Sequence, residues 1–223
     1  MVKFLTCFQA GSNRDSAMME HIVGRKNLEG VSAILKGYEL CVMKTKHFPD
    51  KKYPNAILAP DISARDLMRK HWGDDFEMHM IRKSKKNPNN IMKGIIRKLT
   101  PKEYEYIRVW EMMDMGVQED IIVAVEDEND KMVIAITSGW EDPDRSCDRV
   151  LNGANYENYV VTKQAMLDKA DEVRGLVDKK MTEISETRRK RLIEIRNQRA
   201  IDLNKKCKAL QKKFDKELNS KKK

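Results

Sequence analysis

The chain has 223 residues and a net charge of +9 at pH 7; 35% of its residues are charged and 6% are aromatic. That length suits one domain with a core of its own plus an appendage, and so polar a composition indicates a solvated extension. No window approaches twenty apolar residues and no secretory leader is visible, which excludes a transmembrane helix and leads us to expect a cytoplasmic protein without membrane contact.

The first part of the chain alternates short apolar runs with turn-forming residues. The predicted elements are a buried strand at 3–8, a short helix at 16–23 that Gly24 ends, strands at 31–36 and 38–44 that meet at Gly37, a loop at 46–56, a helix capped by Asp61 that runs to His71, and a strand at 76–81. Strands therefore outnumber helices here, and none of them is long.

A clear helix start follows the next strand, which is predicted at 91–99. Thr100 has the chemistry of an N-cap, Pro101 suits the first helical position, and Glu103 completes a capping box. Two strands at 120–125 and 132–137 then form a predicted hairpin, and a loop covers 138–149. The expected fold class is α+β, with a mainly antiparallel sheet curled into a small β-barrel and short helices around it.

From about Val161 the pattern becomes helical, so we divide the chain into a body (residues 1–161) and a tail (residues 162–223). Apolar positions in the tail recur in steps of 4-3-4. This eleven-residue period favours a straight or slightly right-handed apolar stripe along the helix. No Gly or Pro follows Gly175, so one long C-terminal helix of up to sixty residues is expected. Such a helix could join copies of the chain into a homo-oligomer like a coiled coil.

The basic charge lies in the tail. Residues 162–223 carry 20 basic and 10 acidic residues, a net charge of +10, whereas residues 1–161 have a net charge of −1. A run at 188–191 and further lysines indicate nonspecific contact with nucleic acid, although a solvated helix face that keeps the protein soluble is an equally ordinary explanation. A site for a zwitterionic small molecule would belong in the body.

Two short motifs in the body carry the candidate chemistry. The loop Gln9-Ala10-Gly11-Ser12-Asn13 follows the first strand, and its backbone N–H groups could converge on a carboxylate or carbonyl oxygen. Glu111 lies about a hundred residues later, between Trp110 and three methionines, and an apolar setting would raise its pKa toward the range of a base. Gly-Ser-Asn is also common turn chemistry, and a helical Glu is often solvated, as we expect for Glu103 and Glu105.

A metal site or bound cofactor is not predicted. The histidines share no ligand spacing, the cysteines show no CxxC pair, and no Gly-x-x-x-x-Gly-Lys loop occurs. The residues concerned are His21, His47, His71, His79, Cys7, Cys41, Cys147 and Cys207. Scattered cysteines are typical of free thiols in a reducing cytosol.

Together the two motifs resemble the γ-glutamylcyclotransferase family. Its members read roughly as a strand, a Tyr-Gly-Ser-Asn loop, a Gly-containing strand, and a helix of the pattern Leu-x-x-Leu-Asp-x-x-Glu that carries the catalytic Glu. Here the strand at 91–99 resembles the Gly-containing strand and 104–111 resembles the helix. Pro143, the segment Val150-Leu-Asn-Gly-Ala154 and Tyr159 resemble later family positions, so the likeness covers about residues 1–165.

The chain departs from the family pattern at three places. Ala10 stands where the family usually has Tyr, and the stretch from Met112 to Gln118 lacks the aromatic residue often found near its end. The Tyr that usually precedes the Gly-Ala step falls on Ser146 or Cys147.

The resemblance implies an enzyme that cyclises a small γ-glutamyl substrate to 5-oxoproline and releases an amine or amino acid. By that resemblance Glu111 moves the proton, and residues Gln9, Ala10, Gly11, Ser12 and Asn13 bind the substrate, with no cofactor. The alternative is a binding or assembly protein that reuses the scaffold, with the basic tail as the working part.

Overall fold

The computed structural model describes residues 2–151 and 164–220, and its named strands form two sheets. The first sheet closes into a barrel in the order β1 (Leu5–Gln9), β5 (Ile91–Leu99), β2 (Val31–Lys36), β6 (Glu119–Asp127) and β7 (Met132–Gly139). The second has the order β4 (Glu77–Lys83), β3 (Tyr38–Lys44) and β8 (Arg149–Leu151). All pairings between these strands are antiparallel except β1 with β7. The predicted α+β class with a small, mainly antiparallel barrel is confirmed.

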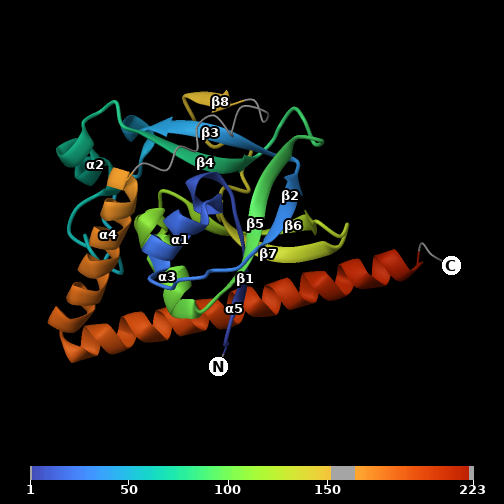
Figure 1. Cartoon of the computed structure of the whole chain (residues 1–223). Coiled ribbons are helices and arrows are strands. Elements are labelled where there is room, and N and C mark those ends of the chain that lie inside the picture. The colour runs from blue at the N-terminus through green and yellow to red at the C-terminus, as the bar shows by residue number, and fades with distance from the viewer. Residues whose placement is uncertain (1, 152–163, 221–223) are drawn as a thin grey trace.

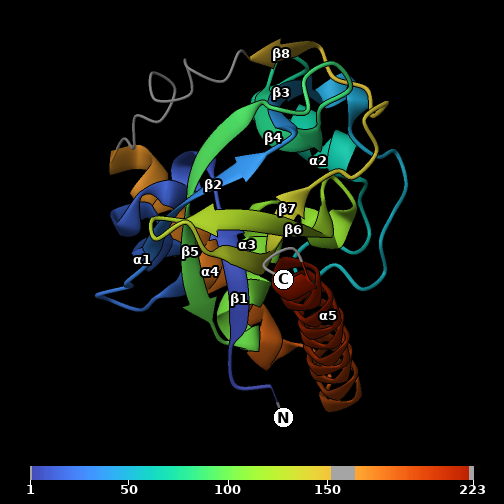
Figure 2. The same cartoon turned by 90° about the vertical axis from the view of Figure 1, so that its right-hand side faces the viewer.

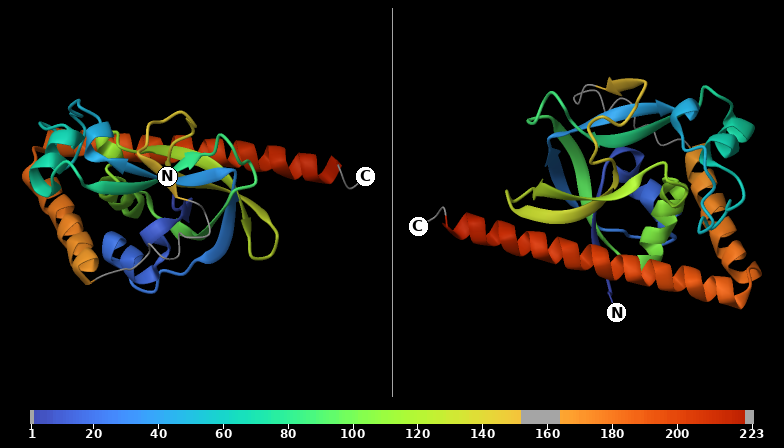
Figure 3. Two further views of the ribbon diagram at one scale, coloured as in Figure 1. Left: turned by 90° about the horizontal axis from the view of Figure 1, so that it is seen from above. Right: turned by 180° about the vertical axis from the view of Figure 1, so that it is seen from behind.

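Helices cover one side and the base of the barrel and one flank of the second sheet, where Ala64 and Met68 pack with Met43 and Met80 (Figures 1 and 2). They are α1 (Ser16–Val23), α2 (Ala64–Trp72), α3 (Pro101–Trp110), α4 (Gln164–Glu183) and α5 (Glu186–Ser220), with 3₁₀ turns η1 (Gly11–Arg14), η2 (Thr45–His47) and η3 (Met113–Met115). The long helix α5 runs beneath the barrel (Figure 1), and both views in Figure 3 show that it extends beyond the barrel on the side of the C-terminus.

The chain passes from the barrel into the second sheet at Gly37, the bend predicted between two strands. The two sheets share apolar contacts, because Phe8 and Leu35 of the barrel lie in one buried cluster with Val42 and Ile81 of the second sheet. The second sheet was not predicted, since its strands pair over long sequence separations. Its strands β3 and β4 supply part of the wall of the cavity described below.

Helix starts follow local chemistry, with one correction. The capping box of α3 is present: Thr100 Oγ1 accepts from Glu103 N at 3.2 Å, and Glu103 Oε2 accepts from Thr100 N at 2.7 Å. The prediction that Asp61 caps α2 is wrong. Ser63 is the cap, and its Oγ accepts from Asp66 N at 3.1 Å, which satisfies a free N–H of the first turn.

The expectation that Glu103 and Glu105 are solvated is also wrong. Both side chains are largely buried, and each has an arginine partner at 2.7 Å: Arg25 Nε for Glu103 and Arg199 Nη1 for Glu105. The second pair joins α3 to α5, so a residue predicted to face water instead holds the tail to the body.

The predicted long C-terminal helix is confirmed as α5, but it does not span the whole tail, because the separate helix α4 precedes it. The break falls at Ile184 and Ser185, where Ser185 Oγ accepts from Arg188 N at 3.3 Å and opens α5. Ile184 packs against the main core cluster at the same point. A local cap and an apolar anchor therefore turn the chain, so that both helices can pack on the body.

The apolar stripe of the tail is covered by the chain's own body as far as Leu203, whereas Leu210 is exposed. Val177, Leu192 and Leu203 are buried in the same core cluster as Leu5 and Ile107. Helix α4 packs on α1, and α5 packs on α3 and β7.

The boundary predicted at 161/162 lies outside the described residues, and the division into two units stays a prediction. Within residues 2–151 and 164–220, every helix falls short of the length or apolarity that crossing a membrane would need.

The barrel closes at a short junction between β1 and β7, which we call the seam. These parallel strands pair at Cys7 and Ile136. Further along β7, the Gln211 side chain of α5 makes hydrogen bonds that a neighbouring strand would otherwise make. Its Oε1 accepts from Ile134 N at 2.9 Å, and its Nε2 donates to Met132 O at 3.2 Å. The helix thus satisfies backbone groups that the seam leaves unpaired.

Candidate functional site

The predicted loop leaves the end of β1 and turns sharply inward. Ala10 is extended, Gly11 has φ of 68°, and residues 11–14 then form the 3₁₀ turn η1. A left-handed residue at this point favours glycine, since a Cβ would crowd the backbone. Asp15 next caps α1 by accepting from Ala17 N at 2.8 Å. The loop is therefore fixed at both ends by regular structure.

Gly94 on β5 lies against the end of β1, directly before the loop, where a side chain would not fit. A Cβ at this position would lie 2.3 Å from the Phe8 ring and 2.7 Å from the Gln9 carbonyl oxygen. Both distances are far inside van der Waals contact, so only glycine allows β1 and β5 to approach this closely. This is the glycine of the strand at 91–99 whose resemblance to a family strand was noted from the sequence.

Arg97 holds the loop from within, and sequence reasoning missed it. Arg97 is 2% exposed, and its guanidinium donates to Gln9 Oε1 at 3.2 Å, to Asn13 O and Arg14 O at 2.8 Å each, and to Ser16 Oγ at 3.1 Å. Burial lowers the pKa of Arg97 to about 10, which still leaves it charged at neutral pH. The same strand also contains Lys93 and Lys98, so the sequence did not single out Arg97.

Glu111 lies just past the last helical residue of α3, where the chain reverses. Met112 adopts a left-handed conformation with φ of 51°, a strained state for this residue type, and accepts from Met115 N and Val117 N, both at 3.1 Å. The reversal brings Gln118 back toward the helix end. It therefore places an amide side chain directly beside the Glu111 carboxylate.

Two amides hold that carboxylate. Asn13 Nδ2 donates to Glu111 Oε1 at 2.8 Å, and Gln118 Nε2 donates to Oε2 at 2.5 Å. Burial raises the pKa of the Glu111 carboxyl above its ordinary value, and the hydrogen bonds from Asn13 and Gln118 act in the opposite direction. Gln118, noted from the sequence only as a missing aromatic residue, is thus a direct partner of the candidate base.

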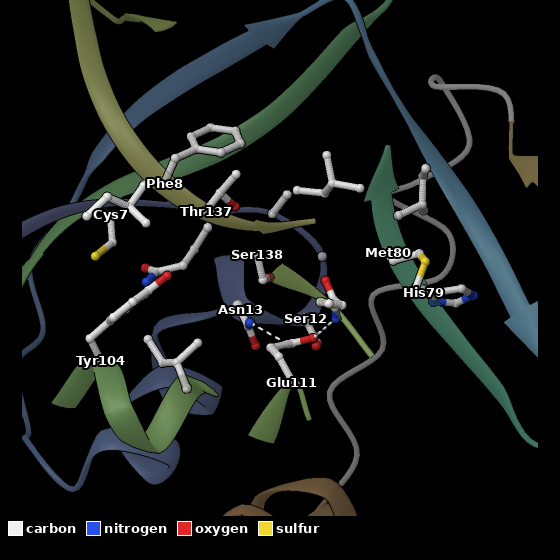
Figure 4. A pocket seen from close by; sticks show the side chains of 18 of the residues that line it. Cys7, Phe8, Ser12, Asn13, His79, Met80, Tyr104, Glu111, Thr137 and Ser138 are labelled. Atoms are coloured by element: carbon white, nitrogen blue, oxygen red, sulfur yellow. Dashed lines mark hydrogen bonds between the residues drawn. The ribbon is translucent and has the colours of Figure 1, made fainter. Parts of the chain in front are cut away.

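These groups face one cavity of about 280 Å³, which we call the loop cavity (Figure 4). All six predicted site residues line it: Gln9, Ala10, Gly11, Ser12, Asn13 and Glu111. Further lining comes from β7 (Thr137, Ser138), β4 (His79, Met80), α3 (Tyr104) and the first turn of α4 (Met166). In Figure 4 the side chains of Asn13 and Glu111 point toward each other across this space.

Two polar atoms at the loop cavity have no hydrogen-bond partner among the residues that the structure describes. Gln9 is 4% exposed and its Nε2 has no acceptor, while Asn13 is 5% exposed and its Oδ1 has no donor. Buried polar groups are normally satisfied, so an unpartnered donor and an unpartnered acceptor beside a cavity are suited to a ligand that carries both functions. A molecule with an ammonium and a carboxylate has that property.

Other predicted positions lie elsewhere or beyond the described residues. Cys147 and Pro143 are not among the residues that line the loop cavity. Asn152 to Ala154 and Tyr159 fall outside the described residues. Within residues 2–151 and 164–220, no cluster of three or more His, Cys, Asp or Glu side chains could hold a metal ion.

No family model matches the chain, and no curated protein matches it. Solved structures do. A γ-glutamyl cyclotransferase aligns over 86% of this chain and 99% of its own at 11% identity, with a TM-score of 0.47. A yeast γ-glutamyl cyclotransferase specific to glutathione aligns over 80% and 97% at 10% identity, with a TM-score of 0.40. A protein from Arabidopsis thaliana aligns over 65% and 68% at 19% identity, with a TM-score of 0.39.

Proposed function

We propose that this protein is an enzyme that cyclises a γ-glutamyl amide to 5-oxoproline and releases an amine or amino acid. One observation supports the proposal most directly: the buried Glu111 carboxylate, held by Asn13 and Gln118, shares a cavity with the loop at 9–13. A proton carrier and a set of backbone donors are the two components that intramolecular acyl transfer requires.

In the proposed reaction the α-amino nitrogen of the substrate attacks its own γ-carbonyl carbon. Glu111 takes a proton from the α-ammonium group, which frees the nitrogen lone pair for attack. A carbon–nitrogen bond closes the five-membered ring, and the original amide bond then breaks. The attacking nitrogen loses two protons in all, and both end on the departing amine, which leaves as an ammonium ion.

The loop has the complementary task. Backbone N–H groups of residues 11–13 would stabilise the negative charge that develops on the carbonyl oxygen. The free Gln9 Nε2 would donate to the substrate carboxylate, and the free Asn13 Oδ1 would accept from the substrate ammonium. Because both reacting groups belong to one molecule, positioning and proton transfer supply most of what the step needs.

The test is release of 5-oxoproline from γ-glutamyl dipeptides, measured by mass spectrometry. Glu111→Gln should lower kcat by roughly 10²–10⁴-fold, because the amide cannot carry a proton. The matched control is Glu119→Gln, which changes an exposed carboxylate at the start of β6 and should leave kcat unaltered. Equal turnover by wild type and Glu111→Gln would remove Glu111 from the proposed mechanism.

A second candidate function is supported by the exposed basic face of α5. Lys205, Lys206 and Lys208 face solvent while the apolar side of the helix packs inward. Such a face suits nonspecific binding to nucleic acid, which can be measured with a random-sequence duplex at several salt concentrations. Replacing all three lysines with glutamine should flatten the slope of log affinity against log salt by roughly one per lost phosphate contact.

A further inference from the structure

A second and larger cavity opens beside the loop cavity. It has a volume of about 550 Å³ and shares four lining residues with the first: Ser12, His79, Glu111 and Met166. We call it the apolar annex, because most of its described lining is hydrophobic, including Leu67, Met68, Trp72, Phe76, Trp110 and Met112. Glu111 therefore stands at the junction of a small, partly polar space and a large apolar one.

The position of Glu111 decides what each space can hold. If Glu111 returns a proton to the departing nitrogen, that nitrogen must lie within hydrogen-bond reach of the carboxylate. The glutamyl part would then occupy the loop cavity, where the unpartnered Gln9 and Asn13 atoms are. The substituent on the nitrogen has to extend away from the ring that forms, and the annex is the second space that Glu111 lines.

The annex also has the chemistry of an apolar binding site. Trp72 is 52% exposed, and its indole packs against the Phe76 ring in a tilted arrangement with 5.5 Å between the ring centroids. Lys169 Nζ lies 5.9 Å from the centroid of the same indole, and Glu77 and Asp114 line the annex too, so its lining carries charges of both signs. Large exposed aromatic surface beside a catalytic carboxylate gains stability when an apolar group covers it.

We propose that the apolar annex binds the departing half of the substrate and selects γ-glutamyl amides whose amine carries a large apolar or aromatic side chain. This specificity rests on the proposed cyclisation. A small departing group such as glycine would leave the annex unfilled, and its binding would forgo the burial of Trp72, Leu67 and their neighbours.

The experiment measures kcat/KM for 5-oxoproline release from γ-glutamyl-glycine, γ-glutamyl-leucine and γ-glutamyl-phenylalanine. The value for γ-glutamyl-phenylalanine should exceed that for γ-glutamyl-glycine by at least about tenfold, since a single buried methylene already discriminates by that factor. Equal values for all three would overturn the annex proposal while the proposed cyclisation stands.

Variants then test whether residues of the annex cause the preference for apolar departing groups. Trp72→Ala should reduce the ratio of the phenylalanine value to the glycine value, because it removes apolar surface from the annex. Phe4→Ala is the matched control: this aromatic ring is 40% exposed, precedes β1 and does not line the annex, so the ratio should persist. A ratio that survives both Trp72→Ala and Leu67→Ala would place the preference elsewhere and overturn the proposal.

A lack of 5-oxoproline from every substrate would instead remove the proposed function. The annex is then tested by calorimetry with 2-phenylethylamine and ethylamine as probes. Binding of the aromatic amine alone, weakened by Trp72→Ala, would support the annex as a site for apolar amines. Absence of binding by 2-phenylethylamine would overturn it.

Discussion

At the scale of single residues, two opposing influences meet at the Glu111 carboxylate. Burial favours its protonated form, and the amide donors of Asn13 and Gln118 favour its ionised form; the net result is a raised pKa. A carboxylate balanced in this way suits a group that must both take and return a proton, because a base works best with a pKa near the working pH.

This balance gives a prediction for pH dependence. Glu111 must be ionised to accept a proton, so kcat/KM should fall as the pH drops through its raised pKa. Gln118→Met removes one donor from the ionised form, which raises the pKa further and should move the acidic limb of the profile to higher pH. Gln198→Met, on the exposed side of α5, should leave the limb in place. A limb that moves to lower pH in Gln118→Met would contradict this account of Glu111.

The sequence predicted the loop at 9–13 and Glu111 because both lie in short local motifs. It did not predict Arg97 or Gln118, for a physical reason. Arg97 acts on backbone carbonyls of a loop more than eighty residues away, and those acceptors exist only once the loop has folded over β5. Gln118 reaches Glu111 only because Met112 takes a left-handed turn that its residue type does not favour.

At the scale of secondary structure, helix ends that depend on local capping residues were predicted to the residue. Gly24 ends α1, and Thr100 with Pro101 opens α3. The second sheet, the Ser63 cap and the break before Ser185 were not predicted. The sheet depends on pairing between distant strands. Asp61 and Ser63 are both suited to a cap by residue type, and the break at Ile184 and Ser185 coincides with the packing of Ile184 on the distant core.

Substitutions at two glycines distinguish a position where tertiary packing requires glycine from one where only helix propensity matters. Gly94→Ala should destabilise the fold by about 1–3 kcal/mol, because the added methyl would overlap the Phe8 ring and the Gln9 carbonyl. Gly175→Ala, in helix α4 with open space around the new methyl, should instead stabilise by about 0.5–1 kcal/mol. Chemical denaturation measures both, and shifts of the same sign would contradict the close approach of β1 and β5.

At the scale of the whole molecule, the tail completes the core of the body. Leu203 on α5 is 6% exposed and packs in the main core cluster, whereas Leu210, two turns on, is 40% exposed. Leu203→Ala should cost about 2–5 kcal/mol of unfolding free energy, and Leu210→Ala should stay within about 0.5 kcal/mol of wild type. Thermal unfolding that fails to separate the two variants would indicate a tail that folds apart from the body.

The Gln211 contacts at the seam have a further consequence. A strand whose N–H and C=O groups lack partners is a template for the strand of another molecule, which is how many proteins aggregate. Because one glutamine of α5 occupies Ile134 N and Met132 O, this part of β7 offers no such template while the helix is docked. We therefore expect docked α5 to prevent edge-to-edge association between the β7 strands of different chains. Displacing the helix would expose Ile134 N and Met132 O and would favour aggregation through this strand.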